Sequence, residues 1–244
     1  MKVQKTVVVL GMHRTGTSLA AGILHLLGLH MGSYFFGKTS NNPTGHFEDL
    51  DFLSLNQDIL QSAGGDWMNP PTHNNILKQA PYYEDRIKNL INMRNSHLSF
   101  WGWKDPRTCL TFDLYKNYLV NPYLIVCNRP NNQIAESLMR RQNLIKNAGL
   151  ELASIYKDRI DNIVSNFPEE KILHLQFDDL RHNPFIAVHS VRQFLSLKVD
   201  QRKINKAIRL VKNKKELFRL QQRRKNIEKC KSVFKKLLGR KSTS

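Results

Sequence analysis

The stretch VVVLGMHRTGTSLAAG, from Val7 to Gly22, decides the fold of this chain. Its first letters complete an apolar, β-branched run over residues 2–10 that stops at a glycine, which predicts a buried strand. Its last letters open a helical pattern over residues 17–29. A glycine-rich turn between a strand and a helix points backbone N–H groups at one place, where the helix dipole adds positive charge. The stretch therefore predicts an anion-binding loop.

The loop departs from the phosphate-binding motif of ATP and GTP enzymes, which reads G-x-x-x-x-G-K-[ST]. Here the frame runs from Gly11 to Ser18 with threonine in place of the lysine, and Arg14 lies inside it. The hydroxyl groups of Thr15, Thr17 and Ser18 add further donors. The loop therefore favours phosphate or a similar oxyanion, without specifying a nucleotide.

After the loop, short apolar runs alternate with helical patterns. Further strands are predicted to start at Phe100 and to span Pro122–Cys127 and Lys171–Gln176. The helical patterns cover Leu50–Leu60, Tyr82–Met93, Thr108–Tyr118, Asn131–Asn147, Ala153–Phe167 and Asn183–Leu195. Residues 64–75, GGDWMNPPTHNN, are expected to be irregular. This alternation predicts an α/β fold with a mainly parallel sheet that is covered on both faces.

The net charge of +18 is concentrated at the C-terminal end. From Lys198 onward the sequence holds 18 Lys and Arg against 3 Asp and Glu. We therefore expect a folded domain over residues 1–197, followed by a basic helical extension over residues 198–244. Such a tail suggests an anionic polymer or a membrane surface as its partner, and a solvated helical end is the plain alternative. Nucleic acid is disfavoured because the tail has few aromatic residues for stacking.

The cysteines and the apolar runs indicate in which cellular compartment the protein is expected. Cys109, Cys127 and Cys230 are far apart and odd in number, so they predict neither a disulfide framework nor a metal site. No apolar run is long enough for a membrane span, and the apolar stretch near the N-terminus is too short for a secretory signal. We therefore expect a cytoplasmic protein, and the sequence leaves its oligomeric state open.

The strand predicted over Pro122–Cys127 ends in a basic segment. Kinases and NTPases hold Mg²⁺ with an Asp near the end of such a strand. Here the strand is followed by Asn128, Arg129 and Pro130. A site with arginine in place of the metal can still stabilise charge on a transferred group. The sequence therefore favours transfer of an anionic group without a metal.

These residues resemble those of a known family, the sulfotransferases that use PAPS (3′-phosphoadenylyl sulfate). RTGTS, residues 14–18, resembles the loop that binds the 5′-phosphosulfate in that family. Arg129 at a strand end, with Ser137 eight positions later, resembles the site for the 3′-phosphate. A Lys-Asp-Pro segment is present at Lys104, and the late segment FDDLRHNP runs from Phe177 to Pro184.

The elements lie in the family's order between Val7 and Leu197. The likeness is to the bacterial sulfotransferase-like proteins and, more distantly, to the tyrosylprotein sulfotransferases. It implies the three-layer sandwich of the P-loop NTPases and a transferase that uses PAPS as donor, releases PAP and needs no metal. It also implies that PAPS is bound by Arg14, Thr15, Gly16, Thr17, Ser18, Arg129 and Ser137.

The resemblance implies catalytic roles as well. Arg14 and Lys104 would stabilise the oxygens of the transferring group. Glu48 would take the proton of the acceptor, and His46 is the alternative base, because other branches of the family use histidine. The acceptor would be a hydroxyl or amine of a carbohydrate, a small molecule or a protein, and Trp67 is a candidate for stacking against it.

Two other functions stay open at this point. A small-molecule or nucleotide kinase with a degenerate loop would bind Mg·ATP. A nucleic-acid-binding or polyanion-binding protein that acts through its tail would lose affinity steeply with salt.

Overall fold

The computed structural model describes residues 4–35, 45–142 and 144–211. In these ranges four parallel strands form one sheet in the order β2-β1-β3-β4. The strands are β1 (Lys5–Leu10), β2 (Phe100–Lys104), β3 (Pro122–Asn128) and β4 (Ile172–Gln176). The helices are α1 (Thr17–Leu26), α2 (Leu50–Ser62), α3 (His73–Leu77), α4 (Ala80–His97), α5 (Thr108–Tyr115), α6 (Asn131–Gln142), α7 (Lys146–Ser165), α8 (Phe177–His182) and α9 (Pro184–Phe194). Residues 201–211 are also helical.

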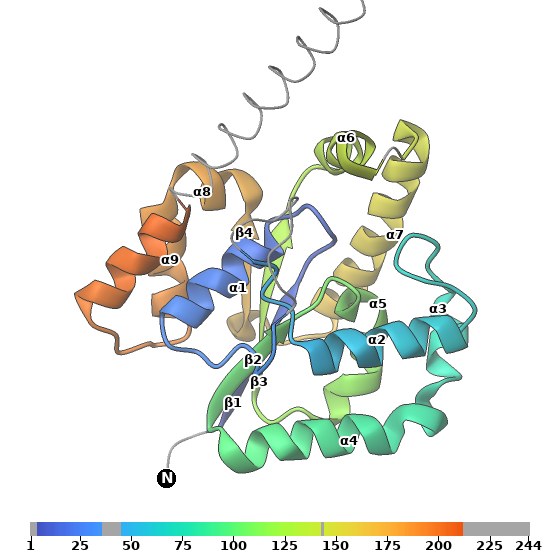
Figure 1. The fold of residues 1–244 in the computed structure, drawn as a ribbon, viewed down its shortest axis with the longest axis horizontal. Coiled ribbons are helices and arrows are strands. Elements are labelled where there is room, and N and C mark those ends of the chain that lie inside the picture. The colour runs from blue at the N-terminus through green and yellow to red at the C-terminus, as the bar shows by residue number, and fades with distance from the viewer. Residues whose placement is uncertain (1–3, 36–44, 143, 212–244) are drawn as a thin grey trace, which may run out of the picture.

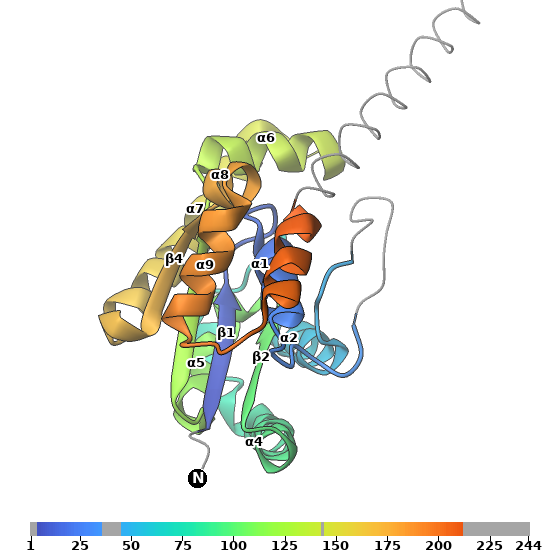
Figure 2. The same ribbon diagram turned by 90° about the vertical axis from the view of Figure 1, so that its left-hand side faces the viewer.

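Successive residues of β1 point to opposite faces of the sheet, and each face carries its own core. Val8 and Leu10 join the larger core, together with side chains of α2, α4, α5, α6 and α7. Val7 and Val9 join the second core, together with α1, α9 and residues 201–211. Figures 1 and 2 show these two helical layers on either side of the sheet. The predicted three-layer α/β sandwich is therefore confirmed, and its described strands are all parallel.

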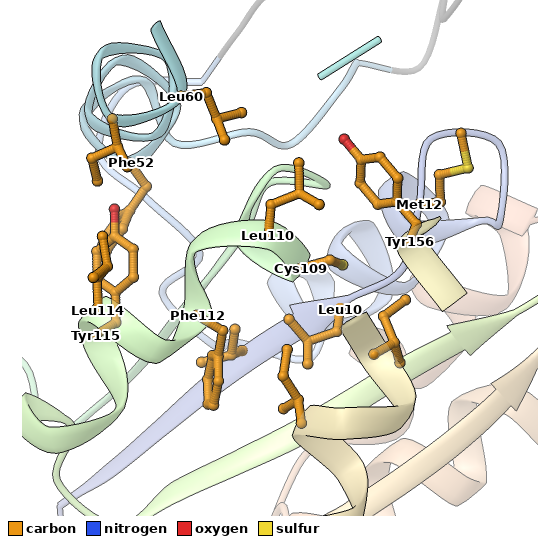
Figure 3. Packing of buried hydrophobic residues seen from close by; sticks show 14 of the residues in the cluster. Leu10, Met12, Phe52, Leu60, Cys109, Leu110, Phe112, Leu114, Tyr115 and Tyr156 are labelled. Carbon is orange, nitrogen blue, oxygen red and sulfur yellow. The ribbon is translucent and has the colours of Figure 1, made fainter. Parts of the chain in front are cut away.

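Aromatic side chains fill much of the larger core. Trp103 stacks on Phe52, with ring centroids 4.3 Å apart and planes 8° apart. Trp101 lies 5.7 Å from Trp103, and both indoles are buried. In the same core, Met12 of the loop after β1 lies near Tyr156 of α7 (Figure 3). The loop therefore packs against side chains of the larger core.

The strand register brings the carboxyl ends of the strands to one edge of the sheet. Val9 of β1 is opposite Lys104 of β2, and Asn128 of β3 is opposite Gln176 of β4. The segments that follow these strands therefore lie at the same edge. In open parallel sheets, ligands bind outside the carboxyl ends of the strands.

The structure corrects one predicted helix. The helix predicted over Asn131–Asn147 is interrupted, because α6 ends at Gln142 and α7 begins at Lys146. A Cβ at Gly149 would lie 3.0 Å from the Cα of Ala135 on α6, so the two helices approach each other closely there. Glycine, which has no side chain, allows this close packing of α6 and α7.

Two further segments differ from their predicted structure, namely the segment expected to be irregular and the start of the basic extension. The segment predicted as irregular over residues 64–75 ends in α3, because the Thr72 hydroxyl caps that helix by accepting a hydrogen bond from the Asn75 N–H. The start of the basic extension packs into the second core through residues 201–211. The remainder of that extension, residues 212–244, lies outside the described residues.

Candidate active site

Two glycines give the loop after β1 its shape. Gly11 has a φ of +146°, and a Cβ there would lie 2.6 Å from Thr15 Oγ1 and 2.9 Å from the Cys127 carbonyl oxygen. Gly16 has a φ of +98°, and a Cβ there would lie 3.1 Å from the Phe177 ring. Both positions combine a left-handed backbone with close neighbours, so both require glycine.

Hydrogen bonds fix the loop but leave the start of α1 uncapped. The Thr15 hydroxyl donates to the Met12 carbonyl oxygen at 2.8 Å, and the Gly11 N–H donates to Cys109 Sγ at 3.1 Å. The Thr15 hydroxyl therefore holds the loop itself. Gly16 is the N-cap residue of α1 and provides no side-chain cap, so the N–H groups of the first turn can bind an anion.

Arg14, Arg129 and Ser137 meet at the edge of the sheet, although they come from separate segments. Arg14 has a φ of +78°, and its Nε donates a hydrogen bond to Ser137 Oγ at 3.0 Å. Arg129 Nη1 donates to the Arg14 carbonyl oxygen at 2.9 Å, and its guanidinium lies 4.0 Å from the centre of the Phe177 ring. The loop, the end of β3 and α6 therefore contribute to one cluster.

This cluster is strongly positive. Burial, and then the nearby guanidinium groups of Arg141, Arg129 and Arg140, lower the pKa of Arg14 to about 9. The pKa of Arg129 is also lowered, by burial and then by Arg140. Sequence reasoning missed Arg140 and Arg141, although they follow Ser137 by three and four residues and so lie on its side of α6. A bound anion would relieve the repulsion among these arginines.

Lys104, the last residue of β2, connects the predicted base Glu48 with Ser18 at the start of α1. Its Nζ donates to Glu48 Oε1 at 2.6 Å and to Ser18 Oγ at 3.3 Å. The Lys104 side chain is 1% exposed and that of Glu48 is 7% exposed. Two charges this enclosed depend on each other, because either one alone would be buried without compensation.

The acidic residues that follow Glu48 form hydrogen bonds and ion pairs that fix the start of α2. Asp49 is the N-cap of α2 and accepts a hydrogen bond from the Asp51 N–H. Arg94 donates to both carboxylates, at 2.9 Å to Asp49 and at 2.5 Å to Asp51. Burial raises the pKa of Asp49. These contacts anchor the segment that carries Glu48.

A buried polar network fixes the chain after Lys104. Asp105 accepts hydrogen bonds from Arg107 Nη1 and Asn56 Nδ2, both at 2.8 Å. Asn56 in turn accepts from the Thr111 hydroxyl at 2.7 Å. Burial raises the pKa of Asp105. Arg107 is therefore engaged by Asp105, and the network positions Lys104 beside the loop.

Sequence reasoning did not single out His13, although it directly precedes Arg14 in the loop. Its ring lies 4.2 Å from that of Trp67, whose carbonyl oxygen accepts a hydrogen bond from the Tyr156 hydroxyl at 3.1 Å. The Nε2 atom of His13 has no hydrogen-bond partner among the described residues. Burial lowers the pKa of His13 well below 6.5, and nearby positive groups act in the same direction, namely Arg107, Lys104, Arg14 and His46.

Metal ligands and reactive thiols are absent from the described part of the site. Within residues 4–35, 45–142 and 144–211, no three His, Cys, Asp or Glu side chains are placed to hold a metal ion. Cys109 and Cys127 are free and buried, and burial raises the pKa of each thiol to about 12. None of the described helices is both long and apolar enough to cross a membrane.

Comparison with known proteins gives matches among solved structures. No protein-family model matches the sequence, and no significant match is found among curated proteins. Sulfotransferase STF1 from Mycobacterium tuberculosis H37Rv is 15% identical with a TM-score of 0.52, covering 88% of this chain and 76% of that one. The sulfotransferase domain of the Synechococcus PCC 7002 olefin synthase is 14% identical with a TM-score of 0.55, covering 83% and 76%.

A further match of the same kind is the sulfotransferase domain from the curacin biosynthetic pathway. It is 14% identical with a TM-score of 0.52, covering 84% of this chain and 77% of that one. At identities of 14–15%, these matches are evidence of a shared fold. The chain therefore has the fold of the sulfotransferases, and the resemblance that its motifs indicated is confirmed at that level.

Proposed function

We propose that this chain is a sulfotransferase, which transfers the sulfuryl group of PAPS to a hydroxyl or amine of an acceptor without a metal. The observation that carries the proposal is the cluster of Arg14, Arg129 and Ser137 beside the uncapped start of α1. Adjacent arginines next to free helix N–H groups suit a ligand with more than one anionic group. PAPS is such a ligand, because it carries a 3′-phosphate and a 5′-phosphosulfate.

The residues of the cluster fit the two anionic ends of PAPS. Arg129 and Ser137 would bind the 3′-phosphate. The Ser137 hydroxyl accepts a hydrogen bond from Arg14 and still keeps its own hydrogen to donate to a phosphate oxygen. The N–H groups from Gly16 to Ser18 would bind the 5′ end. Arg14 joins the two parts, since its backbone belongs to the loop and its side chain reaches Ser137.

The pair of Lys104 and Glu48 suits the transfer step. PAPS supplies a sulfuryl group on a phosphate leaving group, so the site needs cations for the oxygens and a base for the acceptor. Glu48 is the proposed base, and its Oε1 accepts a hydrogen bond from Lys104 at 2.6 Å. When the Lys104 ammonium turns to an anionic oxygen, Glu48 loses that partner and can accept the proton of the acceptor. The pair would thus couple donor binding to activation of the base.

The acceptor would enter beside the loop that follows α2. Trp67 of this loop is partly exposed and contacts His13 of the anion-binding loop. A partly exposed indole beside a transfer site offers a face for a sugar or an aromatic ring. We therefore propose a carbohydrate or other small-molecule acceptor that stacks on Trp67.

Titration calorimetry with PAP and with Mg·ATP tests the proposal against a kinase. Two carboxylates near the loop are engaged by cations, Glu48 by Lys104 and Asp105 by Arg107, which disfavours their use as Mg²⁺ ligands. We expect PAP to bind and Mg·ATP to bind much more weakly. Mg·ATP binding as tight as PAP binding would contradict the proposal.

The Arg129→Ala variant tests the assigned residues. Loss of a charged hydrogen bond to the 3′-phosphate should weaken PAP binding about 10-fold to 100-fold. The matched control is Arg86→Ala, because Arg86 is an exposed arginine of α4 that pairs with Asp58 outside the cluster. PAP affinity should be unchanged in this control. An equal loss in both variants would refute the assignment of Arg129.

A further inference from the structure

The helix over residues 201–211 is anchored in the protein. Ile204, Ala207 and Val211 are 3%, 0% and 2% exposed and belong to the second core. The backbone of this helix, from which its exposed side chains extend, is therefore held in a fixed position relative to the sheet.

The solvent face of this helix carries a stripe of cations. Arg202, Lys206 and Arg209 are exposed, and they form no ion pair with any residue in the described ranges. At about 100° per residue they share one face, opposite to the buried side chains. We call these three residues the basic stripe. An arrangement with three uncompensated charges on one anchored face attracts a ligand with several negative charges.

The helix runs toward the proposed active site. A Cβ at Gly28, just past α1, would lie 3.2 Å from Lys203 Nζ, whereas a Cβ at Gly22 would lie 2.6 Å from Leu210. The helix is therefore antiparallel to α1 and ends nearer to the anion-binding loop than it begins. With a rise of about 1.5 Å per residue, Gly22 is only about 8 Å along α1 from Thr17.

The same end of the helix lies next to the proposed base. A Cβ at Gly22 would also lie 3.0 Å from the Phe47 ring, so Leu210 and Phe47 meet over α1. Phe47 directly precedes Glu48. After Val211 the sequence continues with more lysine and arginine. The basic stripe therefore leads from the far end of α1 to the side of the site.

We propose that the acceptor is an acidic polysaccharide, which the basic stripe draws to the active site. This inference rests on the proposed function and names the acceptor class that it would use. A polysaccharide offers hydroxyl groups for sulfuryl transfer, and carboxylates that repeat along the same chain can pair with several cations of the stripe. The partly exposed Trp67 beside the loop offers a face on which one sugar ring can stack.

Other polyanions fit the stripe less well. The exposed positions of the helix hold Gln201, Asn205 and charged residues, so this face has no apolar side chain to insert into a membrane. Residues 201–211 also contain no aromatic side chain on which nucleic-acid bases could stack.

Binding of polygalacturonate to the full chain tests the inference. The variant combines Arg202→Gln, Lys206→Gln and Arg209→Gln, which alter exposed side chains and leave the core intact. We expect it to bind polygalacturonate about tenfold more weakly than wild type, with a shallower dependence on salt between about 50 and 200 mM. Its affinity for PAP should be unchanged, because the stripe lies outside the arginine cluster.

A matched control neutralises three exposed cations elsewhere, with Lys78→Gln, Arg86→Gln and Lys116→Gln. It should bind polygalacturonate like wild type. Equal weakening in the control and the stripe variant would overturn the inference, since only the net charge would then matter. Neutral dextran should not bind. Binding of duplex DNA, polyglutamate or phosphatidylserine vesicles as tight as that of polygalacturonate would also overturn it.

Transfer of radiolabelled sulfate from PAPS to polygalacturonate completes the test. The stripe variant should show a raised KM for the polymer with an unchanged kcat. Failure of wild type to bind PAP would refute the proposed function, and the acceptor role with it. PAP binding without binding of polygalacturonate would refute this inference alone.

Discussion

Removing one member of the buried pair between Lys104 and Glu48 should destabilise the protein more than removing both. The side chains are 1% and 7% exposed, and the charged atoms are 2.6 Å apart. Glu48→Gln leaves a buried ammonium with the Ser18 hydroxyl, at 3.3 Å, as its other hydrogen-bond partner. Breaking a buried pair in this way costs about 3–5 kcal/mol, and Lys104→Met should cost a similar amount. The double variant buries neither charge, so its free energy of unfolding should lie within about 2 kcal/mol of the wild-type value.

Urea denaturation of wild type, both single variants and the double variant measures these free energies of unfolding. Each single substitution should lower the free energy of unfolding more than the double substitution does, and the coupling energy between the two residues should be at least about 3 kcal/mol. The matched control is the exposed pair of Arg86 and Asp58, whose charged atoms are 2.9 Å apart and for which the coupling should stay below about 1 kcal/mol. A coupling in the buried pair as small as in this control would refute the reasoning that Lys104 holds Glu48 until the donor binds.

In Gly16→Ala the free energy of unfolding, measured by urea denaturation, should fall by about 1–2 kcal/mol, because the backbone there has a φ of +98° and a Cβ would press on the Phe177 ring. The same variant should lose PAP binding, and normal PAP affinity would contradict this. Since the folded state lowers the pKa of His13 below 6.5, the unfolded chain takes up a proton first as the pH falls. The free energy of unfolding should therefore decrease below pH 6.5 by up to about 1.4 kcal/mol per pH unit, and His13→Phe should remove that part of the slope; an unchanged slope would be the contrary result. Cys109 and Cys127, with pKa values raised to about 12, should not react with Ellman's reagent near about pH 8 until the protein is unfolded; rapid labelling of the native thiols would show that they are accessible.

The loop and the arginine cluster could be predicted because their signals are local. The glycines that the turn requires, Gly11 and Gly16, flank it in the sequence, and the strand and helix on either side have clear periodicities. Ser137 follows Arg129 by eight residues, about two turns of α6, so both face the start of that helix. The parallel sheet then places this helix next to the loop, because β1 and β3 are neighbours.

The contacts around Lys104 could not be predicted because they join segments far apart in the chain. Glu48 reaches Lys104 only because Asp49 caps α2 and pairs with Arg94 of α4. His13 contacts Trp67 only because the segment before α3 folds back over the loop. The close packing of α7 on α6 at Gly149 is likewise a tertiary contact, which no local pattern reveals.

A crystal structure of the protein with PAP would show directly whether the loop and the arginine cluster bind the donor. We expect the 3′-phosphate within hydrogen-bond distance of the Arg129 guanidinium and the Ser137 hydroxyl, and the 5′-phosphate against the N–H groups from Gly16 to Ser18. PAP bound at another edge of the sheet, or bound with the arginine cluster empty, would contradict it.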